Sequence, residues 1–122
     1  MMQGTVTKYQ ARLTVPFLLV GKPNLGIEFV VDTGFAGELT LPASAVAALG
    51  LPFLTELTAN LADDSGVPVK VHIATILWHG QECEVAVLAM GKRPLLGTAL
   101  LAECDLTVEF TDSGSVVIKP RL

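Results

Sequence analysis

The segment FVVDTGFAGELTLP, residues 29–42, decides how the rest of the chain is interpreted. Three apolar residues lead into Asp32, and they predict a strand that is buried on both faces. Leu39 and Leu41 resume the apolar pattern after the polar bend. Burying a carboxylate costs free energy unless hydrogen bonds or an opposite charge compensate it. The segment therefore indicates that Asp32 is a functional residue and does not belong to an ordinary exposed turn.

The Asp32-Thr33-Gly34 triplet alone is not specific, because all three residue types are common in turns. Two similar triplets, residues 64–66 and 112–114, lie among polar residues between expected strands, and both are typical of hairpin turns. The apolar flanks distinguish Asp32 from them. In that setting the carboxylate is a candidate general base, and the glycine allows close backbone approach with its N–H directed at the carboxylate.

Composition argues against several classes of function. The chain has 122 residues, with 8 basic and 12 acidic residues and a net charge of −4, and no basic stripe is present. A nucleic-acid partner is therefore not expected. The apolar stretch at residues 13–20 is broken by Thr14 and Pro16 and is too short to span a bilayer. No small-residue cleavage site follows it, so we expect no cleaved signal, no membrane partner and a cytoplasmic location.

The cysteines and histidines give no metal-binding pattern. Cys83 and Cys104 lack C-x-x-C spacing, and His72 and His79 do not combine with them into a ligand set. We expect two small core residues in a reducing compartment, with no metal and no cofactor.

Strand patterns separated by turn signals cover most of the chain. Alternation over residues 6–20 predicts one strand with Tyr9, Ala11, Leu13 and Val15 on its apolar face. Residues 53–62 and 67–78 predict a hairpin around the turn at 63–66. Further strands are expected at 25–31, 38–41, 82–89, 106–110 and 116–119, and short helices at 42–49 and 98–103.

A second signature lies about sixty residues after the acidic motif. It is the loop Pro94-Leu95-Leu96-Gly97, followed by the expected helix and by a strand at 106–110. Together, the two motifs resemble the active-site segment and the apolar-apolar-Gly loop of retropepsin-like aspartic proteases, particularly small bacterial members with an aromatic residue after Asp-Thr-Gly. The hairpin between the motifs lies where that family has its mobile flap. The resemblance covers roughly residues 13–110.

The resemblance implies a mostly β fold, a retropepsin-like acid protease barrel of antiparallel strands with two short helices. It implies one domain over residues 1–122 that is half of a two-fold dimeric enzyme. Catalysis by two carboxyl groups that share one proton across a water needs a second acid. This chain has one suitable residue, Asp32, so a homodimer must supply the other. The expected activity is aspartic endopeptidase cleavage of a peptide or protein substrate.

Site residues follow from the same resemblance. Asp32, Thr33 and Gly34 are the expected catalytic triplet, in which Thr33 joins the two loops across the interface. The expected substrate-binding residues lie beside the triplet and at the hairpin tip: Phe35, Ala36, Asp64, Ser65 and Gly66. Leu95, Leu96 and Gly97 are expected to pack behind the triplet. Phe35 departs from the small residue that is common in viral members, and the hairpin tip is acidic.

Two other interpretations remain open from the sequence. The chain could be a catalytically inactive module of the same fold that dimerises or binds peptides, in which case replacing Asp32 would leave its function unchanged. It could also be an unrelated β-barrel in which Asp32 belongs to an ordinary turn, which predicts a stable monomer.

Overall fold

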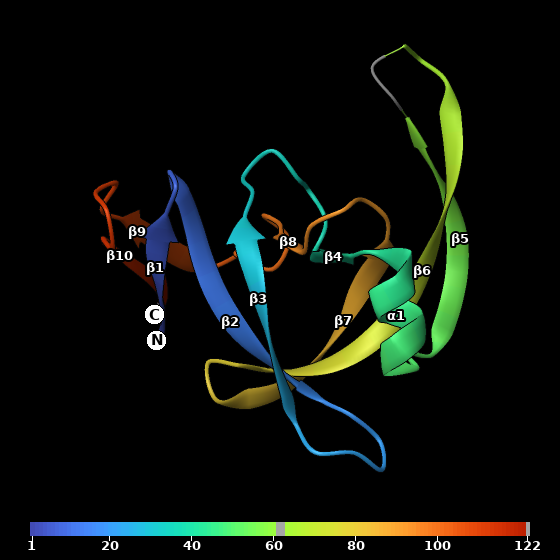
Figure 1. The fold of residues 1–122 in the computed structure, drawn as a ribbon, viewed down its shortest axis with the longest axis horizontal. Helices are drawn as coiled ribbons and strands as arrows, with labels where there is room; N and C mark the ends of the chain where they lie inside the picture. Colours follow the sequence, from blue (N-terminus) through green and yellow to red (C-terminus); the bar gives the residue numbers. More distant parts are fainter. Residues whose placement is uncertain (61–62, 122) are drawn as a thin grey trace.

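The computed structural model describes residues 1–60 and 63–121, and within them the chain forms ten strands and one helix (Figure 1). The predicted strand over residues 53–62 lies partly outside the described residues, since its last two residues are not among them. The elements in chain order are β1 (Met2–Thr7), β2 (Gln10–Leu18), β3 (Leu25–Val31), β4 (Leu39–Leu41), α1 (Ala43–Leu49), β5 (Phe53–Asn60), β6 (Gly66–Trp78), β7 (Gln81–Ala89), β8 (Leu95–Leu96), β9 (Cys104–Val108) and β10 (Ser115–Pro120).

All the strands belong to one sheet, in the order β5-β6-β7-β4-β8-β3-β2-β1-β10-β9. An additional pairing between β6 and β2 closes six of these strands, β2, β3, β8, β4, β7 and β6, into a ring. The prediction of a barrel of antiparallel strands needs correction, because β3–β8 and β4–β7 pair in parallel. The short strand β8 lies between β3 and β4, which run in opposite directions, so it has to be parallel to one of them, and it is parallel to β3.

The predicted single strand over residues 6–20 is wrong, because the chain turns back at Lys8 and Tyr9. Both residues have positive φ angles, 51° and 65°, which suit a tight two-residue hairpin between β1 and β2. Tyr9 was expected on the apolar face but is 91% exposed. The alternation is correct beyond the turn, where Ala11, Leu13 and Val15 are buried.

The first predicted helix is confirmed as α1, and Gly50 ends it in the left-handed conformation at φ 66°. The second predicted helix, at 98–103, is wrong. Those residues form successive turns, in which N–H groups bond to the carbonyl three residues earlier. The segment is held at its start by Thr98 N bonding to Phe35 O and at its end by Arg121 N bonding to Glu103 O, both at 2.8 Å. No helix in residues 1–60 and 63–121 is long and apolar enough to cross a membrane.

The core lies inside the ring of strands. Phe17 of β2 and Phe29 of β3 are fully buried and stack with ring centroids 5.9 Å apart. Burial of a side chain of this size stabilises the fold by roughly 1.5–3 kcal/mol. The predicted β5–β6 hairpin is confirmed over its described residues, and it projects beyond the body of the sheet on the side toward which β3 points (Figure 1).

Candidate active site

Backbone hydrogen bonds fix the position of Asp32 in the bend that follows β3. Asp32 N donates to Leu96 O at 2.9 Å, and Phe35 N donates to Asp32 O at 3.1 Å and closes the turn. Gly34 N donates to Asp32 Oδ1 at 2.9 Å, which confirms that the glycine N–H points at the carboxylate. This hydrogen bond orients the Asp32 carboxylate within the bend.

The two sequence signatures meet at this bend. Strand β8 pairs in parallel with β3, Val30 with Leu95, and antiparallel with β4, Leu39 with Leu96. Leu39 and Leu96 are fully buried. The predicted packing against the triplet is confirmed for Leu96, whose carbonyl accepts from Asp32 N. Leu95 pairs with Val30 of β3, and Gly97 lies against the later part of the bend.

Position 97 requires glycine because backbone atoms of the Asp32 bend lie too close to it for any side chain. A Cβ at Gly97 would lie 2.3 Å from Gly37 O and 2.6 Å from Phe35 O. The half-buried ring of Phe35 covers the same place, and its Cζ would be 2.5 Å from a Cβ at Gly37. Phe35 therefore contacts its own loop, Gly97 and, through its carbonyl, Thr98.

Thr40 and Glu38 support the bend, and the sequence analysis assigned neither of them a role. Thr40 is 2% exposed, and its hydroxyl accepts from Leu95 N at 3.1 Å and donates to Arg93 O at 3.4 Å. Glu38 Oε1 accepts from Ala86 N at 2.8 Å, which joins the bend to β7. A threonine between two leucines in a short buried strand was the available signal, because a buried hydroxyl requires a partner.

The remaining residues of the bend face solvent. Asp32 is half-buried, whereas Thr33, Gly34 and Ala36 are exposed. Within the described part of the chain, the Thr33 hydroxyl makes no hydrogen bond. The bend thus presents one oriented carboxylate and one hydroxyl at the surface of the molecule.

The other predicted substrate-binding residues lie at the tip of the β5–β6 hairpin. Asp64, Ser65 and Gly66 are exposed, and Asp64 has a positive φ of 62°. Ser65 donates its N–H at 3.0 Å and its hydroxyl at 2.6 Å to Asp63 Oδ1, and these bonds hold the pKa of Asp63 below its ordinary value. Among residues 1–60 and 63–121, no hydrogen bond joins this tip to the Asp32 bend.

A cysteine–histidine contact lies away from the bend. Cys104 Sγ is 3.6 Å from His79 Nε2. Burial lowers the pKa of His79 and raises the pKa of the Cys104 thiol, so both groups are favoured in their neutral forms. A neutral thiol is a poor nucleophile. The pair therefore does not have the electrostatics of a cysteine–histidine catalytic site.

Comparisons with known proteins complete this description. No protein-family model matches the sequence, and no curated protein matches it significantly. Among solved structures, the chain is similar to a retropepsin-like aspartic protease from Rickettsia conorii, with a TM-score of 0.65 and 15% sequence identity over 98% of this chain and 89% of that chain. The loop 94–97 is hydrogen-bonded to the bend that carries Asp32. The fold matches that of the solved structure over almost its whole length. The chain therefore has the retropepsin-like fold.

Proposed function

We propose that this protein is an aspartic endopeptidase that works as a homodimer, with one Asp32 from each protomer. The observation that carries the proposal is the anchored bend, in which Gly34 N–H orients Asp32 Oδ1 and Leu96 O fixes the Asp32 backbone. Activation of the water needs two carboxyl groups, and a two-fold axis beside the bend supplies the second one from the partner protomer.

In the proposed reaction the two carboxyl groups hold one proton and one water between them. The charged carboxylate takes a proton from the water as its oxygen attacks the carbonyl carbon of the peptide bond. The protonated carboxyl gives its proton to the carbonyl oxygen. The tetrahedral intermediate then collapses and the C–N bond breaks. One hydroxyl of the intermediate returns a proton to the second carboxyl group as the carbonyl re-forms, and the leaving nitrogen takes the proton that the first carboxyl group received from the water. No residue of the chain forms a bond to the substrate.

Other residues have supporting roles in the proposal. Thr33 is exposed, so its hydroxyl can bond to the backbone of the partner's bend. The β5–β6 hairpin covers an extended peptide, which adds as a further strand and leaves Asp64, Ser65 and Gly66 beside it. Phe35 and Ala36 flank the carboxylate. Free Cys83 and Cys104 suit a reducing compartment such as the cytoplasm.

The test is Asp32→Asn, which keeps the size of the side chain but removes its acid–base chemistry. We expect cleavage of a randomised peptide pool to fall by at least about 100-fold, with thermal unfolding unchanged. Asp105→Asn, at an exposed surface site paired with Arg121 at 3.6 Å, is the control that keeps activity. Equal mixing of Asp32→Asn and parent protomers should leave about a quarter of the activity, because each active dimer needs two intact copies.

Two results would overturn the proposal. The first is purified Asp32→Asn protein that cleaves every substrate as the parent does. The second is parent protein that binds peptides but releases no products between acidic and neutral pH, which would favour the inactive peptide-binding module.

A further inference from the structure

Two hairpin turns at one end of the sheet expose aromatic side chains. Tyr9, in the β1–β2 turn, is 91% exposed, and Phe110, before the β9–β10 turn, is 66% exposed. Backbone bonds hold the two turns together, with Val6 N donating to Gly114 O at 2.9 Å and Ser113 N donating to Val6 O at 3.1 Å. A cavity of about 440 Å³ opens there, lined by Val6, Lys8, Tyr9, Phe110, Thr111 and Asp112. We call Lys8, Tyr9, Phe110 and Asp112 the turn patch.

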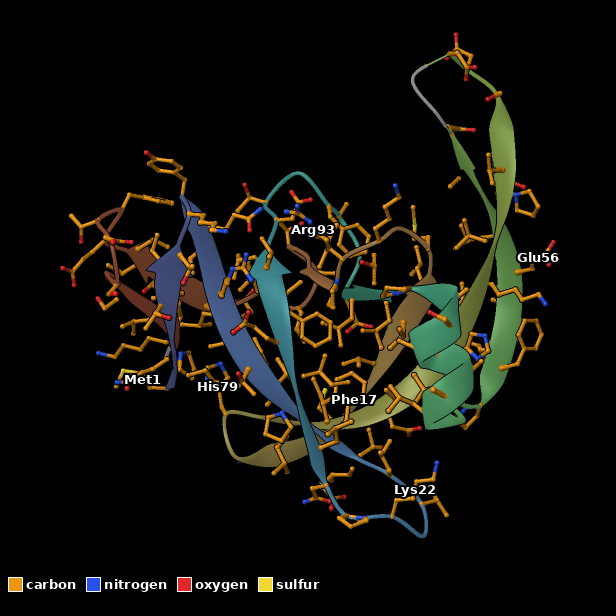
Figure 2. All side chains as sticks on the ribbon, viewed as in Figure 1. Met1, Phe17, Lys22, Glu56, His79 and Arg93 are labelled. Carbon is orange, nitrogen blue, oxygen red and sulfur yellow. The ribbon has the colours of Figure 1, made fainter. Side chains whose placement is uncertain are left out.

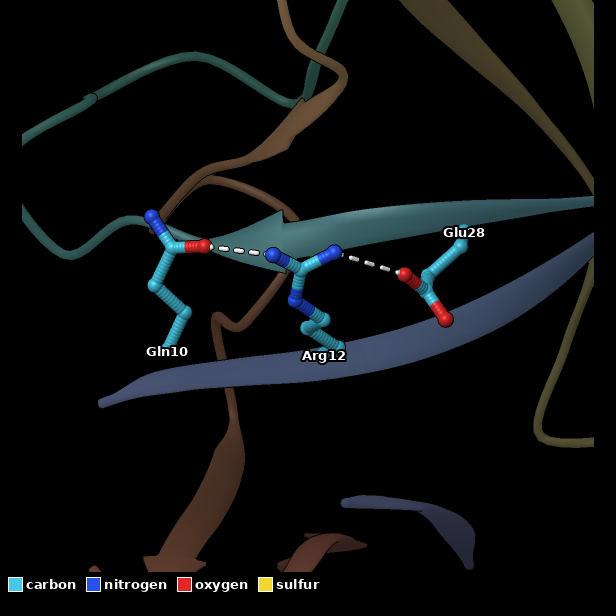
Figure 3. Close-up of polar contacts among 3 residues, drawn as sticks. All are labelled: Gln10, Arg12 and Glu28. Atoms are coloured by element: carbon cyan, nitrogen blue, oxygen red, sulfur yellow. Dashed lines mark hydrogen bonds and ion pairs between the residues drawn. The ribbon is translucent and has the colours of Figure 1, made fainter. Parts of the chain in front are cut away.

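The strand register places the turn patch beside the Asp32 bend. Arg12 of β2 pairs with Val30 of β3, so the same register continued by two residues brings Gln10 level with Asp32. Tyr9 is the next residue along. The Gln10 side chain is fixed by Arg12, which donates to it at 2.8 Å and pairs with Glu28 at 3.0 Å (Figure 3). In Figure 1 the β1–β2 turn and the loop after β3 lie at the same end of their strands.

The turn patch carries one positive and one negative residue. Within the described part of the chain, neither Lys8 nor Asp112 forms an ion pair. Both line the same cavity as the aromatic residues of the turn patch. A surface with both signs of charge can complement itself across a two-fold axis, since Lys8 of one copy can face Asp112 of the other.

We infer that a second copy of this chain docks on the turn patch, beside the paired Asp32 bends. The inference rests on the proposed function, because a two-fold axis that joins the bends also brings together whatever flanks them. Buried aromatic side chains are among the groups that contribute most to such contacts, and complementary charges fix their register. The patch thus gives the dimer a contact area outside the catalytic centre.

Charge reversal tests the inference. We expect Lys8→Asp or Asp112→Lys alone to raise the dimer dissociation constant about tenfold at low salt, and the double reversal to restore it within about threefold. Aspartate tolerates the positive φ of residue 8 better than most residues. Lys22→Asp is the matched control, because Lys22 lies in the turn between β2 and β3, at the end of these strands away from the turn patch (Figure 2). It should leave the dimer dissociation constant unchanged. Sedimentation velocity over a dilution series measures each constant.

The aromatic contribution has its own matched pair. Phe110→Ser should raise the dissociation constant at least about tenfold. Phe53→Ser should leave it unchanged, because Phe53 is comparably exposed at 59% but lies on β5, far along the sheet order from the turn patch. Near-unchanged thermal unfolding of diluted protein shows that each variant is folded.

The outcomes separate this inference from the proposed function. Turn-patch variants whose dimer dissociation constants all equal that of the parent overturn the inference, while the Asp32→Asn result still decides the proposed function. Turn-patch variants that dissociate as expected, in a protein whose activity ignores Asp32→Asn, support the patch and overturn the protease. A parent that is monomeric at every concentration, or variants that stay dimeric but lose peptide binding, overturn the inference.

Discussion

Gly97→Ala should destabilise the protein sharply, because backbone atoms block the new methyl group. Ordinary contact begins at 3.4 Å, whereas the Cβ would lie 2.3 Å from Gly37 O, so the bend must move by about 1.1 Å. Gly37 O accepts from Ala99 N at 3.2 Å, and Phe35 O accepts from Thr98 N at 2.8 Å. Losing these two bonds costs about 1–3 kcal/mol in the free energy of unfolding, since a typical intramolecular hydrogen bond contributes roughly 0.5–1.5 kcal/mol.

Urea unfolding at one fixed protomer concentration measures this loss, because dimerisation would make apparent stability depend on concentration. Gly37→Ala is the matched comparison, since its Cβ would meet the Phe35 ring at 2.5 and 2.7 Å. Removing that ring with Phe35→Ala should therefore rescue Gly37→Ala. It should not rescue Gly97→Ala, because Gly37 O still lies in the way.

The reasoning fails if Gly97→Ala unfolds within about 0.5 kcal/mol of the parent, the range of ordinary surface substitutions. It also fails if Phe35→Ala restores Gly97→Ala as fully as it restores Gly37→Ala. Either result would mean that the bend and the loop 94–97 can separate without cost, and the anchor proposed for Asp32 would be lost with them.

Two further predictions concern a buried hydroxyl and a titrating ring. Thr40→Val should lower the free energy of unfolding by about 1–3 kcal/mol, because Leu95 N–H loses its acceptor, whereas the same change at exposed Thr55 should have little effect in the same urea titration. His79 has a pKa below 6.5 through burial and, secondarily, the positive amino terminus, so the unfolded chain binds a proton more readily. Stability should therefore fall as pH drops below 6.5 toward the lowered pKa, and His79→Asn should flatten that fall in unfolding curves measured at successive pH values.

The acidic bend could be predicted from sequence because its flanks are unambiguous. The three apolar residues before Asp32 predicted a strand, which is confirmed as β3, and the resumed apolar pattern predicted the return to the core at Leu39 and Leu41. The expected burial on both faces is wrong, because only Phe29 is fully buried and the two valines are half-buried. The contact between the bend and the loop 94–97 was also expected, although only from the family resemblance. The parallel pairing of β8 was not, because β8 has two residues and two residues carry no periodicity.

Two other wrong predictions, the single strand over residues 6–20 and the helix at 98–103, also have physical causes. The turn at Lys8 and Tyr9 contains no glycine, asparagine or proline, so the alternation ran through it without a break. Two ordinary residues accept positive φ there because the flanking strands pair from Gly4–Leu13 to Thr7–Gln10. Residues 98–103 are rich in alanine and leucine, which favour a helix, but tertiary hydrogen bonds to the bend hold the segment in turns.

The Asp32 bend and the Asp63 turn show why local geometry alone does not identify the candidate site. In each, a carboxylate accepts a hydrogen bond from the N–H two residues later, at 2.9 Å to Gly34 and 3.0 Å to Ser65. The Asp63 turn caps an exposed hairpin, and its bonds act within the turn. The Asp32 bend is bonded to the buried residue Leu96, whose carbonyl accepts from Asp32 N, so the core fixes the position of the Asp32 backbone. That fixed position separates a candidate acid–base group from a turn former, and it depends on residues more than sixty positions away.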